Sequence, residues 1–94
     1  MLNGKWKHTL DVSDVFYHGD PDDVYALNKG MHDVAERVER WQNAYFPTDW
    51  EFEYIADELV DAASAEDIDW FNEVWDRLYD WADSNRVWVR TWTV

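Results

Sequence analysis

Cysteine is absent from the sequence, which excludes disulfide bonds and thiolate metal sites. Only two prolines and three glycines occur among 94 residues, and they form no linker or low-complexity tract. No apolar run approaches the length of a membrane span, and the first ten residues lack the apolar stretch of a signal peptide. We therefore expect a soluble, cytoplasmic protein.

Basic residues are also few, and their distribution divides the chain. Residues 11–85 hold all 21 acidic residues and four basic ones, a net charge of −17, whereas the two ends hold four basic residues and no acid. Such a molecule is not expected to bind nucleic acid through a basic footprint or to adhere to anionic membrane. Hydrophobic residues make up 47% of the chain and recur periodically, which argues against an acidic disordered protein.

Aromatic residues are abundant, at 18% of the chain with eight tryptophans. A domain of this size buries only a modest core, and large rings bury more area than aliphatic side chains do. Most of the tryptophans are therefore expected to be structural.

Hydrophobic periodicity predicts two strands and three helices in a single domain over residues 1–94. An isolated strand is not stable, so the strands are expected to pair. The predicted fold class is α+β, with a small antiparallel sheet that pairs the N- and C-terminal strands and packs against three helices. The expected ranges are strands at about 5–12 and 86–94 and helices at about 21–42, 49–63 and 65–84.

The helix ends are predicted from capping residues. Asp20 before Pro21 is typical of a helix start, Thr48 and Glu51 have the spacing of a capping box, and Ser64 is expected to cap the third helix. Asn85 is expected to stop that helix in a left-handed conformation.

Five acidic residues of the third predicted helix follow a 4-3-4-3 spacing, which places them within about 80° of arc and along about 21 Å. We call this set the acidic stripe: Asp69, Glu73, Asp76, Asp80 and Asp83. One interpretation is a solvated face, and the other is electrostatic imitation of nucleic acid. One charge per about 5 Å is sparser than the about 3.4 Å of a DNA strand. Imitation therefore needs the acids that the second helix is expected to turn outward, Glu51, Glu53, Asp57, Glu58 and Asp61.

The second predicted helix also turns aromatic residues away from its core face. Trp50, Tyr54, Asp57 and Asp61 stand at positions i, i+4, i+7 and i+11. Exposed aromatics bordered by charge resemble protein-binding hot spots. The alternative is that Trp50 folds back against the preceding turn or the sheet.

On the third helix, Trp70, Val74 and Trp81 widen the apolar arc to about 180°, more than one buried seam requires. Either this helix is central and contacts elements on two sides, or the flank is an oligomer contact. The central position is the favoured interpretation.

Catalytic patterns are weak. His8, His18 and His32 lack metal-ligand spacing. The chain contains no complete EF-hand loop, phosphate-binding glycine loop or nucleophile elbow. We expect no enzymatic activity, no cofactor and no metal site.

Two segments carry a resemblance. WKHTLDVSDVF near the start and VWDRLYDWADSNRVWV near the end are similar to small acidic proteins of unknown activity encoded by phages of actinobacteria. No catalytic or binding residue carries over from that group. The resemblance implies a phage protein in the cytoplasm of an infected cell, where it acts on host machinery by countering a defence or altering growth.

These features favour a non-enzymatic binding protein that modulates or inhibits a host protein. Its acidic surface would imitate nucleic acid and block a basic, nucleic-acid-binding site. The alternative is an aromatic-led interaction or homo-oligomerisation module, through Trp50 and Tyr54 or through Trp88 and Trp92, whose acidity serves only solubility. Steered binding weakens as salt rises, whereas aromatic-led binding persists.

Overall fold

The structure is a computed structural model that describes residues 7–13, 15 and 24–91. Helices account for 71% of these residues, so the protein is mostly helical. Asp20, Pro21 and His18 lie outside the described residues. The elements in chain order are β1 (His8–Asp11), α1 (Val24–Tyr45), α2 (Trp50–Ser64), α3 (Ile68–Ser84) and β2 (Val87–Arg90).

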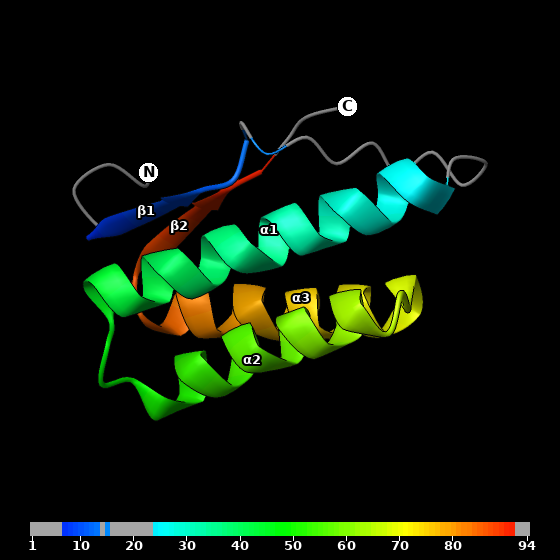
Figure 1. The fold of residues 1–94 in the computed structure, drawn as a ribbon. Helices are drawn as coiled ribbons and strands as arrows, with labels where there is room; N and C mark the ends of the chain where they lie inside the picture. Colours follow the sequence, from blue (N-terminus) through cyan, green and yellow to red (C-terminus); the bar gives the residue numbers. More distant parts are fainter. Residues whose placement is uncertain (1–6, 14, 16–23, 92–94) are drawn as a thin grey trace.

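The two terminal strands pair with each other, but they run parallel (Figure 1). The predicted antiparallel sheet is therefore wrong, and so is the predicted α+β class, because the described residues are mostly helical and form only a two-stranded sheet. His8 lies opposite Val87, and Asp11 lies opposite Arg90. Figure 1 shows the reason: each element runs opposite to the one before it, in the order β1, α1, α2, α3 and β2. An even number of reversals returns it to its starting direction, and the helices form the crossover that parallel strands require.

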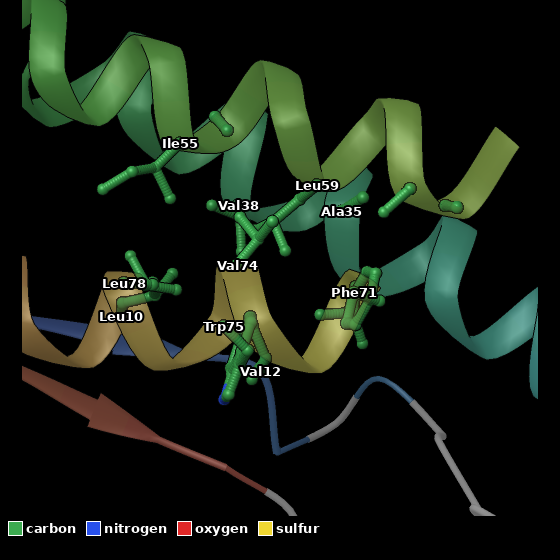
Figure 2. Packing of buried hydrophobic residues seen from close by; sticks show 14 of the residues in the cluster. Leu10, Val12, Ala35, Val38, Ile55, Leu59, Phe71, Val74, Trp75 and Leu78 are labelled. Atoms are coloured by element: carbon green, nitrogen blue, oxygen red, sulfur yellow. The ribbon is translucent and has the colours of Figure 1, made fainter. Parts of the chain in front are cut away.

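Helix α3 lies at the centre of the fold. It packs against α2 on one side and β2 on the other (Figures 1 and 2). This position agrees with the favoured interpretation of its wide apolar arc. Val74 and Trp81 are buried, and Trp70 is half-buried against the core.

One hydrophobic core joins all three helices to the strands. Figure 2 shows Val38 of α1, Leu59 of α2 and Val74 of α3 converging at its centre, and all three are fully buried. Burying a side chain of this size contributes about 1.5–3 kcal/mol. Val24, at the start of α1, lies outside this core, because it is 60% exposed.

Strand β1 is held on α1 by side chains that donate to its backbone. The Trp41 indole Nε1–H donates to the Thr9 carbonyl at 3.1 Å, and the Arg37 guanidinium donates to the Asp11 carbonyl at 3.1 Å. The His8 ring contacts the rings of Trp41, Tyr45 and Phe46 at the end of α1. This cluster gives several of the aromatic residues a structural role, so part of the high aromatic content needs no functional explanation.

Aspartates cap both α2 and α3, so the capping roles expected of Thr48 and Ser64 are wrong. The Asp49 carboxylate accepts from the Phe52 backbone N–H at 3.0 Å, and the Asp67 carboxylate accepts from Trp70 N–H at 3.0 Å. Helix α3 begins later than expected, because residues 65–67 close the end of α2. The Asp67 N–H donates to Ala62 O and the Glu66 N–H to Ala63 O, a Schellman motif with Glu66 at a φ of 56°.

Asn85 is not left-handed, contrary to the expectation. Its φ is −108°, and its side-chain amide donates to the Trp81 carbonyl at 2.8 Å. Arg86 takes the left-handed conformation instead, with a φ of 58°. The left-handed position therefore lies one residue later, and Asn85 caps α3 with both its side-chain amide and its backbone N–H, which donates to the Trp81 and Ala82 carbonyls.

Candidate functional site

The acidic stripe lies on the solvent side of α3. Each of its five residues is exposed, from Asp69 to Asp83. The opposite side of the helix carries its buried residues, which are Phe71, Val74, Trp75, Leu78, Trp81 and Ala82. The helical spacing thus separates charge from core.

A second acidic row lies on α2, which packs beside α3 (Figure 1). Its exposed members are Glu51, Glu53, Asp57 and Asp61. We call these four residues and the acidic stripe together the acidic face. Residues 49–85 contain thirteen acidic residues and one basic residue, a net charge of −12.

Glu58 does not belong to the outward row, so the expectation that it faces solvent is wrong. Its side chain is only 19% exposed, and its Oε2 lies 2.6 Å from an Arg77 guanidinium nitrogen. The same oxygen accepts from the Trp70 indole Nε1–H at 2.8 Å. Both donors come from α3, so Glu58 joins the two helices.

The pKa values of the Glu58–Arg77 pair shift in the direction that this contact requires. Hydrogen bonds from Arg77 and then Trp70 hold the pKa of the Glu58 carboxyl below its usual value. The hydrogen bond to Glu58 raises the pKa of Arg77. The single positive charge among residues 49–85 is thereby neutralised within the fold.

A second tryptophan of α3 binds the other end of α2. The Trp81 indole Nε1–H donates to Asp49 Oδ2 at 3.2 Å, while the other oxygen of Asp49 caps α2. The Trp81 ring stacks on Phe52 with ring centroids 4.1 Å apart. Asp49 therefore links the start of α2 to the end of α3.

An open groove of about 390 Å³ lies between these two helix ends. Trp50, Tyr54 and Asp80 are the predicted site residues that the structure brings together there. Trp50 is 78% exposed and Tyr54 62% exposed, so Trp50 does not fold back against the fold. The groove is completed by Glu51, Ile55, Arg77, Trp81, Ser84 and Asn85. We call it the α2–α3 groove.

A second groove, of about 510 Å³, lies on the other side of the acidic stripe, between α3 and β2. Tyr79 and the exposed Trp88 line it, together with Asp80 and Asp83. Asp80 therefore borders both grooves. The other predicted site residues line neither groove: they are Asp57, Asp61, Asp69, Glu73 and Asp76.

Sequence reasoning missed Arg77 and Glu51 as parts of the groove. Arg77 had a signal, because it is the only basic residue among the acids of residues 49–85. No sequence feature indicated that Glu51 lines the groove. Helical periodicity predicts that Glu51 faces solvent, but it does not show that α3 ends beside it.

The described residues carry neither a metal site nor a membrane span. No three His, Asp or Glu side chains among them are arranged to hold a metal ion. No helix in the described part of the chain is long and apolar enough to cross a membrane.

Comparison with protein-family models, with curated proteins and with solved structures gave no match for this chain.

Proposed function

We propose that this protein is a non-enzymatic binding protein whose acidic face engages a basic surface of another protein. The observation that supports the proposal most strongly is the charge of −12 over residues 49–85, which comprise two adjacent helices with their caps and connection. The lone arginine of that segment is paired with Glu58. The face therefore presents carboxylates to a partner and no uncompensated cation.

The cost of this arrangement also supports a binding role. Like charges spaced three and four residues apart destabilise a helix by about 0.2–0.5 kcal/mol per pair. The acidic stripe repeats that spacing over four consecutive intervals, on the exposed side of a helix whose packing does not require it. A steered encounter with a basic partner uses such a field, which raises association rates at low salt.

The partner we propose is a host protein with a basic, nucleic-acid-binding surface, and the protein acts as its inhibitor by occupying that surface. The exposed acids of α2 lie beside the acidic stripe of α3. Together they provide more negative charges than the acidic stripe alone, whose charges are sparser than those of a DNA strand. The resemblance to small phage proteins supports an infected actinobacterial cell as the setting.

A second candidate is favoured by the exposure of Trp50 and Tyr54. In this candidate the aromatic side chains carry the binding, to a partner or to a second copy, and the acids only keep the protein soluble. Binding then persists in high salt and is lost when Trp50 is replaced by alanine.

The test is capture of partners from an actinobacterial host lysate at low and high salt, with three bait proteins. The first is the wild type, and the second reverses part of the acidic stripe (Glu73→Lys, Asp76→Lys and Asp80→Lys). The third reverses three acids of α1 (Asp33→Lys, Glu36→Lys and Glu39→Lys), so its net charge matches that of the second.

We expect basic, nucleic-acid-binding proteins on the wild type and the α1 variant, released by salt and competed by DNA. We expect them to be absent from the stripe variant. Equal capture by all three baits would refute the proposal.

A further inference from the structure

The α2–α3 groove is lined by two exposed aromatic rings that do not contribute to the core. Trp50 and Tyr54 are mostly exposed, and neither ring packs against another ring among the described residues. The buried Trp81, by contrast, stacks on Phe52 and donates to Asp49. The groove thus combines a packed floor with two rings whose faces are available to a ligand.

The charges that line the groove favour a cationic ligand. Glu51 and Asp80 have no ionic or side-chain hydrogen-bonding partner among the described residues, whereas Arg77 is held by Glu58 at 2.6 Å. Two free carboxylates therefore remain beside the two free rings. An anionic ligand would meet them and the field of the whole acidic face.

We propose that the α2–α3 groove receives an arginine side chain of a partner protein, stacked on Trp50 and Tyr54 and paired with Glu51 and Asp80. This proposal rests on the proposed function, in which the partner is basic, and it names the chemistry of one contact. A guanidinium is planar, so it stacks on an aromatic face and donates to carboxylates at its edge at the same time. A lysine ammonium is more strongly hydrated and makes only a point-charge contact there.

A second copy of the chain is a poor occupant of the groove. Each copy carries a net charge of −13, and like charges brought together across an interface oppose association. Charge complementarity therefore selects a basic partner.

The test uses two glycine-spaced peptides of equal length and charge, one with arginines and one with lysines. Binding is measured by titration at fixed salt, and the indole N–H signals of the protein are followed by NMR. We expect the arginine peptide to bind about two- to five-fold more tightly than the lysine peptide, the range of an exposed cation–π contact. The Trp50 indole signal should shift most with the arginine peptide.

Matched variants locate the contact. Trp50→Ala and Tyr54→Ala should remove the preference for arginine, while Tyr25→Ala, at a ring 80% exposed on α1, should keep it. Asp80→Asn should weaken arginine-peptide binding more than Asp76→Asn does, although both remove one charge from exposed positions of α3. Circular dichroism of each variant establishes that the fold is retained.

The outcomes separate this proposal from the function on which it rests. If both peptides bind equally and Trp50→Ala and Tyr54→Ala change neither, the arginine site is wrong and the acidic face stands. If neither peptide binds any variant, both proposals are wrong. Self-association of the protein that is lost in Trp50→Ala would assign the groove to a second copy and would also overturn the arginine site.

Discussion

Glu58 shows at the scale of one residue how a carboxylate on a highly acidic helix becomes structural. It accepts from Arg77 at 2.6 Å and from Trp70 at 2.8 Å, whereas its neighbour Asp57 is exposed. Both partners come from α3. The contact therefore contributes to the packing of α2 on α3, and its strength depends on the charge of the carboxylate.

We predict that Glu58→Gln lowers the free energy of unfolding by about 1 kcal/mol at pH 7, a value reduced for the partial exposure of Arg77. The folded-state pKa of Glu58 lies below its ordinary value of 4.5. Its contribution is therefore complete above about pH 4.5 and is lost as pH falls through the folded-state pKa. Urea denaturation of both proteins between pH 7 and pH 3 measures this difference. A difference that stays constant over that range would contradict the mechanism, and Asp57→Asn serves as the control, with little effect expected.

A second test concerns the hydrogen bond that the uncharged Trp81 indole N–H donates to Asp49. Trp81→Phe keeps a ring to stack on Phe52 but loses the bond to Asp49. We expect it to lower the free energy of unfolding by about 0.5–1.5 kcal/mol. Trp81→Ala should lower it by about 3–5 kcal/mol, because it also leaves a cavity. A free energy of unfolding for Trp81→Phe equal to that of the wild type, measured by urea denaturation, would show that the Asp49 bond contributes nothing.

Periodicity in the sequence was sufficient to find the buried faces, and insufficient to find side-chain partners. Phe52, Leu59 and Leu78 recur at helical spacing and are fully buried, because a 3.6-residue repeat fixes which side of a helix they occupy. The same repeat predicted that Glu58 faces solvent. It cannot show which side chains of a neighbouring helix meet that position, so the contacts with Arg77 and Trp70 were missed.

At the scale of elements, the parallel sheet follows from a feature that the sequence contains. The three helices between the strands were predicted, and alternating directions through them give parallel strands. The antiparallel expectation rested only on the need of each strand for a partner, without regard to the direction of the helices between the strands. Counting the reversals of the chain would have corrected it.

The end of α2 provides a prediction at the scale of elements. Glu66 occupies a left-handed position with a φ of 56°, which disfavours side chains with a Cβ and suits glycine. We expect Glu66→Gly to raise the free energy of unfolding by about 0.5–1 kcal/mol.

The same replacement inside the helix should have the opposite effect. Glu53→Gly, at an exposed position within α2, should lower the free energy of unfolding by about 1 kcal/mol. Thermal or urea denaturation measures both variants. The same sign in both would mean that the removed charge, rather than the backbone, decides the outcome.

At the scale of the whole molecule, the charge of −13 opposes the compact state. Sodium chloride screens this repulsion, so we expect the urea midpoint to rise as salt increases to about 0.3 M. The stripe variant with three acids reversed to lysine carries −7, since each reversal adds two charges, and its midpoint should rise less. A midpoint independent of salt in both proteins would contradict this view of their stability.

The proposal that the acidic face binds a basic partner is tested by the affinity for a captured partner, measured against salt for the three bait proteins. For the wild type and the α1 variant, we predict that the dissociation constant increases steadily with salt. For the stripe variant, we predict binding more than about ten-fold weaker at low salt and a reduced salt dependence. An affinity for the stripe variant equal to that of the wild type at every salt concentration would contradict the proposal.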